Sequence, residues 1–383
     1  MEKSSTGNNW GSSTTCIHAG AIHDPKHRGM VSPLYPATAY EYLDVEIHAY
    51  PRYFNTPNMI AVSQKIAALE NGERSLVFGS GMAAIYSTLF ALLSPGDHII
   101  FQNDLYGGTH YMINTEMKRN GISYTFLDEV TEDSLSQALR PETKAVYIET
   151  PSNPLLKIID MSVVAEFCKA HDLLSVIDNT FASPINQNPI DHGIDIVLHS
   201  GTKYLGGHSD ILCGAVVSRE SLIAKIREHS VNYGGNLNAQ MCHLLERSLL
   251  TLALRMKQIN ANAMEVSKFL EGHKNVERVF YPGLENHPDH ELAKSQMKGY
   301  GGMLSFEIKS DPDQFVKQLS IIRPAMSLGG VESTITSPRQ TSHSKIGAEE
   351  RQKAGISDNL LRLSVGIEDA GDLKTDLNHA LEI

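Results

Sequence analysis

The sequence has 383 residues, of which 41% are hydrophobic and 20% charged, so it is long enough to form a large core divided between two domains. Its formal net charge of -11, with no block of basic residues, argues against nonspecific binding to nucleic acid. No apolar run approaches the ~20 residues that span a bilayer, and the N-terminal residues have no pattern of a signal or transit peptide, so we expect a cytoplasmic protein without a membrane segment.

The first residues are predicted to form an arm rather than a domain. Residues 1–57 are rich in Gly, Pro, Ser and Thr and show little periodicity, which is typical of an extended segment that packs on other parts of a protein. An apolar stripe from Ile60 to Leu69 has helical spacing and ends at Glu70-Asn71-Gly72, a plausible stop signal. The first helix of the main body is therefore expected directly after the arm.

A cluster of small residues comes next and predicts an anion site. Phe78 and Gly79 precede Ser80, Gly81 and Met82, and an apolar helical pattern follows them. Backbone N–H groups at the start of a helix can point at an anion, and the helix dipole favours a phosphate there. Ser80, Gly81 and Met82 are therefore the phosphate candidates. The alternative is that this lone Gly-x-Gly marks a tight turn.

Strands and helices alternate through the middle of the chain. Short apolar runs predict strands near residues 98–101, 124–127, 145–149, 173–177, 195–198 and 213–217. Helices are predicted near residues 132–139 and around an inner stripe of Val164, Phe167, Cys168 and His171. This alternation indicates an α/β protein with a mostly parallel sheet that helices cover on both faces.

Two of these strands are followed by residues that suggest cofactor chemistry. Asp178 follows one strand, and Lys203, between Ser200 and Thr202, follows the next. The carboxyl ends of strands are where open α/β sheets bind ligands. A desolvated lysine can form a Schiff base, flanking hydroxyls can hold a phosphate, and a carboxylate on a pyridine nitrogen strengthens the ring as an electron sink. The alternatives are a solvated loop lysine and an ordinary turn aspartate.

The C-terminal part is predicted to form a smaller domain. Two helical patterns, over residues 239–256 and 259–270, lead into a strand at 276–281. Further strands are predicted near residues 303–308 and 360–363, and further helices near 313–319 and 370–381. Arg362 lies inside an otherwise apolar strand, where a guanidinium is expensive to bury without a partner, so we expect it to bind a ligand.

Cysteines and histidines predict neither a disulfide framework nor a metal site. The four cysteines are far apart and form no C-x-x-C pair, so we expect them to be reduced and mostly buried: Cys16, Cys168, Cys213 and Cys242. The spacings of the 17 histidines match no ligand set, and His287-Pro288-Asp289-His290 is typical of a loop that enters a helix. No metal is expected.

Three motifs together resemble the pyridoxal phosphate (PLP) enzymes of cysteine and methionine metabolism: Asp178-Asn179-Thr180, Ser200-Gly201-Thr202-Lys203-Tyr204 and Gly207-His208-Ser209-Asp210. The resemblance runs from about Thr15 to the C-terminus. It implies a type I, aminotransferase-like PLP fold with an arm (1–57), a PLP-binding large domain (58–257) and a small α+β C-terminal domain (258–383). It also implies a homotetramer, a dimer of dimers with shared active sites.

The resemblance also implies residues that hold pyridoxal 5'-phosphate. Lys203 would form the Schiff base and carry protons, with Asp178 on the pyridine nitrogen and Asn153 on the phenolic oxygen. Tyr106, in Tyr-Gly-Gly-Thr, would stack on the ring as a catalytic residue. The phosphate would be held by Ser80, Gly81, Met82, Ser200 and Thr202, and from a neighbouring subunit by Tyr50 and Arg52. Tyr53 is the alternative to Tyr50, because the spacing to the next helix is one residue longer than usual in the family.

The same resemblance implies a substrate site. Arg362 would pair with the α-carboxylate of an amino acid, with Ser327 and Asn153 nearby. Relatives that act on cystathionine often carry an arginine and a glutamate at the positions of Tyr111 and Met326 in this sequence. Without those charges, a substrate with a shorter or less charged side chain should compete well.

We therefore expect a PLP-dependent carbon–sulfur lyase of transsulfuration that acts on cystathionine by γ-elimination. The alternatives are γ-replacement on an O-acylhomoserine, as in cystathionine γ-synthases, and methionine γ-lyase activity. Dedicated methionine lyases usually have cysteine at the position of Gly108. A dinucleotide-binding dehydrogenase is disfavoured because no G-x-G-x-x-G run follows the first strand. An aminotransferase shares the fold and cofactor, and the Tyr-Gly-Gly-Thr and Ser-Leu-Gly-Gly elements argue against it.

Overall fold

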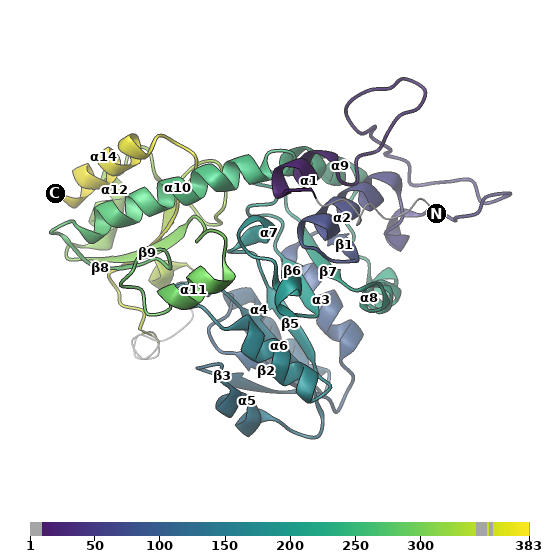
Figure 1. The fold of residues 1–383 in the computed structure, drawn as a ribbon, viewed down its shortest axis with the longest axis horizontal. Helices are drawn as coiled ribbons and strands as arrows, with labels where there is room; N and C mark the ends of the chain where they lie inside the picture. The colour runs from purple at the N-terminus through teal and green to yellow at the C-terminus, as the bar shows by residue number, and fades with distance from the viewer. Residues whose placement is uncertain (1–9, 342–350, 352–354, 383) are drawn as a thin grey trace.

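The structure is a computed structural model that describes residues 10–341, 351 and 355–382. It contains two sheets with helices packed on them, and the long helix α10 (Leu252–Glu271) runs from the first sheet to the second (Figure 1). Among the described residues, no helix is both long enough and apolar enough to cross a bilayer.

The large sheet has seven strands in the order β1-β7-β6-β5-β4-β2-β3. Only β7 runs antiparallel to its neighbours; the other pairs are parallel, which confirms the predicted mostly parallel sheet. The strands are β1 (Arg74–Phe78), β2 (His98–Gln102), β3 (Ser123–Leu127), β4 (Thr143–Glu149), β5 (Leu174–Asp178), β6 (Ile196–His199) and β7 (Gly214–Ser218).

Both faces of the central strands of this sheet are buried, which explains why these strands are largely apolar, whereas the edge strand β3 is only partly buried. Successive side chains of a strand point to opposite faces. On β4, Val146 and Ile148 join one core cluster, whereas Ala145 and Tyr147 join the other. Helices α2 (Pro57–Leu69), α6 (Met161–Ala170) and α9 (Ala239–Leu249) cover the first face. Helices α3 (Gly81–Leu92) and α8 (Glu220–Tyr233) cover the second, together with α4 (Gly107–Met112) and the π-helical turn Ile113–Met117.

The second sheet has five strands in the order β10-β11-β12-β9-β8, and it confirms the predicted small α+β region. Its strands are β8 (Val276–Phe280), β9 (Met303–Ile308), β10 (Arg323–Pro324), β11 (Thr334–Thr336) and β12 (Leu360–Ser364). Helices α10, α12 (Pro312–Gln318) and α14 (Ala370–Leu381) contribute to the core on this sheet, and α11 (His290–Gln296) follows β8 (Figure 1).

Two sequence predictions about helices were wrong in detail. The break predicted after residue 256 lies instead between α9 and α10, at Leu250 and Thr251. At this break the carbonyl of Ser248 accepts hydrogen bonds from the Thr251 hydroxyl (3.3 Å) and the Arg255 guanidinium (3.0 Å). Such side-chain hydrogen bonds compete with the backbone hydrogen bonds that would continue a helix. His171, predicted on the inner stripe, follows the end of α6 and is exposed. The predicted division between residues 257 and 258 falls inside α10, and it stays a prediction.

The arm contains a helix that the sequence did not predict, α1 (Ser12–His18). Its Ser and Thr residues have low helix propensity, so the sequence signal was weak. Tertiary contacts stabilise it instead: Cys16 is fully buried, and the buried ammonium of Lys65 donates to the carbonyls of Cys16 (2.8 Å) and Ile17 (3.3 Å). The helix α1 is thus held on α2, whereas the loops that follow it project from the body (Figure 1).

Candidate active site

Lys203 lies in a tight turn that follows β6. The backbone N–H of Lys203 bonds to the carbonyl of Ser200 (3.1 Å), and that of Thr202 bonds to the carbonyl of Cys213 (3.2 Å), just before β7. A Cβ on Gly201 would lie 2.6 Å from the Cys213 sulfur, so the turn can approach β7 only with glycine there. The Lys203 Nζ donates to the Ser327 Oγ (2.7 Å).

The electrostatic environment of Lys203 favours its neutral amine. Burial and, to a smaller degree, the positive charge of Arg362 lower the pKa of Lys203 to about 8, against the opposing effect of Asp178. A neutral amine is the nucleophilic form of lysine. This lysine is therefore better suited to covalent chemistry than a solvated loop lysine.

Asp178 ends β5 next to this turn. Its Oδ1 accepts hydrogen bonds from the N–H (3.0 Å) and the hydroxyl (2.5 Å) of Thr180, and the Thr180 hydroxyl accepts one from the backbone N–H of Ser200 (2.7 Å). Burial raises the pKa of Asp178, while the Thr180 hydrogen bonds, His199 and Lys203 lower it. The carboxyl group of Asp178 is therefore buried, with two hydrogen bonds from Thr180 that oppose the effect of burial.

The predicted phosphate residues meet at the start of α3. Ser80 caps this helix, with its side chain accepting from the Ala83 N–H (3.0 Å), and a Cβ on Gly81 would lie 2.8 Å from the Ser200 Cβ. The helix N-terminus and the loop after β6 are thus in contact, an arrangement that suits an anion. Met82 is joined to α4 by a contact between its sulfur and the Thr109 hydroxyl (3.9 Å). The hydroxyl of Thr202 bonds to the backbone of Cys213.

Arg362 reaches this edge from the second sheet. It lies on β12, is 8% exposed, and donates from Nη1 to the Oδ1 of Asn153 (2.7 Å), which follows β4. Burial lowers the pKa of Arg362 to about 10, and Glu149 opposes the effect. A guanidinium of this kind can give two parallel hydrogen bonds to a carboxylate.

The loop that carries Ser327 lies directly on the lysine turn. Gly329 has a positive φ of 76°, and a Cβ there would lie 2.9 Å from the Tyr204 backbone nitrogen. The Gly329 N–H donates to the Ser364 hydroxyl at the end of β12 (2.8 Å). The second sheet therefore places both Ser327 and Arg362 beside Lys203.

Tyr106 precedes α4 and is 49% exposed. Its backbone N–H donates to the Oε2 of Glu149 (2.9 Å), the last residue of β4. Burial, followed by the negative charge of Asp178, raises the pKa of Glu149 well above its ordinary value.

The remaining predicted residues are Tyr50, Arg52, Tyr53, Tyr111 and Met326. Arg52 lies in the short helix η1 (Pro51–Tyr53); it donates to the carbonyl of Val231 on α8 (2.8 Å) and lies over the rings of Tyr50 and Tyr53. Tyr111 and Met326 are exposed, by 62% and 78%. Their roles stay predictions, as do the roles of the other site residues.

Sequence reasoning missed Glu149 and Thr180. A charged residue at the carboxyl end of an apolar strand was the signal that selected Asp178, and Glu149 has the same signal at the end of β4. Thr180 follows Asp178 by two positions, a spacing at which side chains commonly bond to each other and to the backbone.

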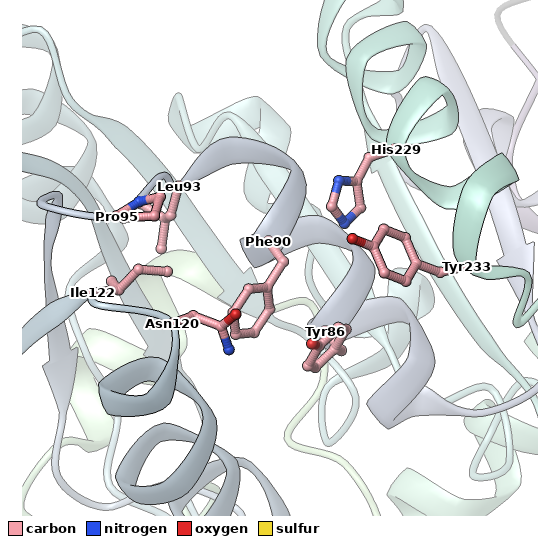
Figure 2. A pocket seen from close by; sticks show the side chains of 8 residues that line it. All are labelled: Tyr86, Phe90, Leu93, Pro95, Asn120, Ile122, His229 and Tyr233. Atoms are coloured by element: carbon pink, nitrogen blue, oxygen red, sulfur yellow. The ribbon is translucent and has the colours of Figure 1, made fainter.

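A separate cavity of about 180 Å³ lies between α3 and α8 (Figure 2). Its lining contains no lysine, arginine or carboxylate, and includes none of the predicted site residues: Tyr86, Phe90, Leu93, Pro95, Asn120, Ile122, His229 and Tyr233. We therefore place the chemistry at the carboxyl edge of the large sheet.

The chain is similar to proteins of one family over nearly its whole length. The model of the Cys/Met metabolism PLP-dependent enzyme family matches residues 13–382. A cystathionine gamma-lyase of Bacillus subtilis (strain 168) is 43% identical over 374 residues, covering 96% of this chain and 98% of that protein. A cystathionine beta-lyase of Lactococcus lactis subsp. cremoris (strain MG1363) is 45% identical over 376 residues, with the same 96% and 98% covered.

A solved structure agrees. The crystal structure of cystathionine gamma synthase from Xanthomonas oryzae pv. oryzae, in complex with aminoacrylate and cysteine, superimposes with a TM-score of 0.94 at 38% identity, covering 98% of each chain. The predicted fold, a large mostly parallel sheet joined to a smaller α+β region as in type I PLP enzymes, is confirmed.

Proposed function

The chain belongs to the Cys/Met metabolism PLP-dependent enzyme family, and from this premise we propose that it is a carbon–sulfur lyase that cleaves cystathionine by γ-elimination. The relatives named above are a γ-lyase, a β-lyase and a γ-synthase, so they agree on the cofactor and differ in the reaction. The choice among these reactions depends on the residues of the site.

Pyridoxal 5'-phosphate is the cofactor of the family, and the residues at the carboxyl edge fit it. Lys203 has an amine of lowered pKa, Asp178 is a buried acid, and the N-terminus of α3 meets Ser200. When bound, PLP supplies an electron sink for negative charge at the substrate α-carbon. We assign its attachment to Lys203, its ring to Asp178, Asn153 and Tyr106, and its phosphate to Ser80, Gly81, Met82, Ser200 and Thr202.

The observation that carries the proposal is the position of Arg362 close enough to Lys203 for its positive charge to lower the lysine pKa. Among the described residues, Asn153 is the only one to which the buried guanidinium of Arg362 donates a hydrogen bond. The guanidinium is therefore suited to bind the α-carboxylate of an amino acid with a charge-assisted pair of hydrogen bonds.

Lys203 is also suited to move protons. Its Nζ takes a proton from the α-carbon and returns one along the substrate chain, as elimination requires. A pKa of about 8 lies near neutrality, where a general base combines the correct protonation state with sufficient strength. The hydrogen bond to Ser327 orients the amine, and Tyr106 orients the ring and assists departure of the sulfur group.

The far end of the substrate site determines which sulfur amino acid fits. Tyr111 and Met326 replace an arginine and a glutamate that relatives acting on cystathionine often carry. Each charged hydrogen bond lost costs about 1.5–3 kcal/mol of binding. Methionine, homocysteine and cysteine are therefore proposed as competing substrates, and Gly108 in place of cysteine argues against a dedicated methionine lyase.

The three candidate reactions differ in their products. In γ-elimination, cystathionine and water give cysteine, 2-oxobutanoate and ammonia; β-elimination would give homocysteine, pyruvate and ammonia. The alternative is γ-replacement, in which cysteine displaces the acyloxy group of an O-acylhomoserine and cystathionine forms. The cystathionine gamma synthase similarity favours this alternative.

A parallel product assay tests the proposal. The PLP-loaded enzyme is incubated with cystathionine, with methionine, and with O-succinylhomoserine plus cysteine, and 2-oxoacids and cystathionine are quantified. We expect 2-oxobutanoate from cystathionine, none from a Lys203→Ala variant, and full activity from the exposed control Lys225→Ala. Efficient cystathionine synthesis with negligible 2-oxoacid from cystathionine would contradict the lyase assignment.

We further propose a homotetramer, a dimer of dimers in which Tyr50 or Tyr53 and Arg52 complete the site of a neighbour. The arm exposes many apolar side chains, among them Met30, Val31, Tyr42, Leu43 and Ile47, and such a surface is typical of a contact between subunits. A cytoplasmic location is proposed from the cysteines, since all four are free and buried, as in reducing compartments.

A further inference from the structure

Glu149 is a buried acid that has no part in the mechanism given above. It is 4% exposed and ends β4, where its own N–H donates to the Oε1 of Gln102 at the end of β2 (2.8 Å). The Nε2 of Gln102 donates in turn to the Asp104 carbonyl (2.8 Å). The end of β4 is therefore joined to the start of the loop that leads from β2 to α4.

The carboxylate of Glu149 makes the second connection to this loop. Its Oε2 accepts the backbone N–H of Tyr106 at 2.9 Å, across 43 positions of sequence. The residue lies directly opposite Asp178 in the β4–β5 register. Two acids side by side in a buried site are costly unless each has a specific partner. For Asp178 the partner is Thr180, and for Glu149 it is the Tyr106 N–H.

The direction of the Tyr106 ring depends on the backbone at this point. Tyr106 is 49% exposed in the single chain, so contacts within the chain leave about half of its surface uncovered. A Cβ on Gly108 would lie 2.5 Å from the Tyr106 Cε1, so the ring lies directly on the backbone of the first turn of α4. A shift of the Tyr106 N–H would therefore move the ring with it.

We propose that Glu149 is a positioning residue, which accepts the Tyr106 N–H and thereby holds the Tyr106 ring in the plane it needs against the cofactor. The inference rests on the proposed function, in which Tyr106 orients the PLP ring. An amide oxygen can accept the same hydrogen bond, whereas a shorter side chain cannot reach it. Glu149→Gln should therefore preserve the function, and Glu149→Asp and Glu149→Ala should impair it.

A double-mutant cycle tests this role. The PLP-loaded variants Glu149→Ala, Glu149→Asp, Glu149→Gln, Tyr106→Ala and Glu149→Ala/Tyr106→Ala are compared by kcat, KM and the circular dichroism of the bound cofactor, which reports how its ring is held. Glu277→Ala, an exposed residue on β8, is the control. We expect kcat to fall roughly tenfold or more in Glu149→Ala and Glu149→Asp, with an altered cofactor signal, and Glu149→Gln to stay within about threefold of wild type.

The double variant should be no slower than Tyr106→Ala alone, because residues that act through one group are not additive. Additive losses, or a Glu149→Gln variant as impaired as Glu149→Ala, would overturn the proposal. If Glu149→Ala does not fold, the comparison of Glu149→Asp with Glu149→Gln decides whether Glu149 positions Tyr106. The circular dichroism of the bound cofactor tests the role of Glu149 without any substrate. It therefore remains a test even if the wild-type enzyme gives no 2-oxoacid from cystathionine, a result that would contradict only the proposed substrate.

Discussion

Lys203 illustrates how burial decides the chemistry of a single residue. Desolvation disfavours its ammonium form more than any other effect, Arg362 adds to this, and Asp178 opposes it. Its folded pKa of about 8 is below the ordinary lysine value, so the amine becomes neutral at a lower pH than in solution. The lowered pKa is a property of the residues around it and is present before any cofactor binds.

This pKa predicts how the cofactor-free protein takes up PLP. The neutral amine attacks the cofactor aldehyde, so the rate of uptake should rise with pH through a midpoint near pH 8 and level off above it, as measured by stopped-flow absorbance. Arg362→Met removes a charge that lowers the pKa, so its midpoint should move to higher pH. A wild-type midpoint near the ordinary lysine value of about 10.4 would contradict the account.

A second residue-scale prediction concerns Arg362. Arg362→Lys keeps the charge but cannot give two parallel hydrogen bonds, so kcat/KM for cystathionine should fall roughly 10- to 100-fold, with KM most affected. Arg278→Lys, on the exposed side of β8, is the matched control and should change kcat/KM by less than about twofold. Equal kinetics for both variants would show that Arg362 does not bind the substrate carboxylate.

Among the elements, the loop between β10 and β11 brings the second sheet into contact with the lysine turn. Gly329 is the residue of closest approach, with a positive φ and only 2.9 Å from its Cβ position to the Tyr204 nitrogen. The position of Ser327, and hence the hydrogen bond to Lys203, depends on this approach.

Gly329→Ala should therefore lower both stability and activity. The left-handed backbone and the close contact together should cost roughly 1–3 kcal/mol, observed as a lower Tm and a lower kcat. Gly371→Ala is the control, because that glycine lies in α14 with open space around its Cβ position, and no loss of stability is expected there. If Gly329→Ala has wild-type Tm and kcat, the loop does not need this approach.

The strands and helices differ in how clearly the sequence predicts them. Six of the seven strands of the large sheet were predicted, because a strand buried on both faces is a largely apolar run. The strand β1 was not predicted; it begins with Arg74 and Ser75 and has only three apolar residues. Strands β10 and β11, of two and three residues, carry no such pattern, and α1 depends on Lys65 rather than on its own residues. The break before α10 depends on contacts of Ser248, Thr251 and Arg255, which no periodicity reveals.

For the candidate site, the sequence predicted residues whose type is unusual for their position. Asp178 and Arg362 were found because a charged residue ends or interrupts an apolar strand, and Lys203 was found because it lies between two hydroxylated residues in the turn after such a strand. Glu149 also ends an apolar strand, but it was not predicted as a site residue. Its hydrogen-bond partner is the Tyr106 N–H, a backbone group that no sequence pattern reveals.

A complete active site is expected to require more than one chain. Arg52 contacts α8 of its own chain, and the arm presents apolar side chains to the outside, so a neighbouring subunit is expected to cover them. The proposed site is complete only when Arg52 and Tyr50 or Tyr53 of one subunit meet Lys203 of another.

Mixing two inactive variants tests this sharing. Arg52→Ala and Lys203→Ala should each have little activity alone. After dissociation and joint reassembly, half of the dimers are hybrids with one intact site, so about a quarter of the wild-type activity should return. Arg227→Ala, on the exposed side of α8, should be active without mixing. No recovery, or a fully active monomer in sedimentation, would contradict a shared site.

The claim on which the rest depends is that the carboxyl edge of the large sheet holds PLP through Lys203. Reduction of the holoenzyme with borohydride, followed by peptide mapping, identifies the attached lysine directly. The account predicts one pyridoxyl group per chain, on the peptide that contains Lys203. A label on another lysine, or an unlabelled chain that still carries tightly bound PLP, would contradict it.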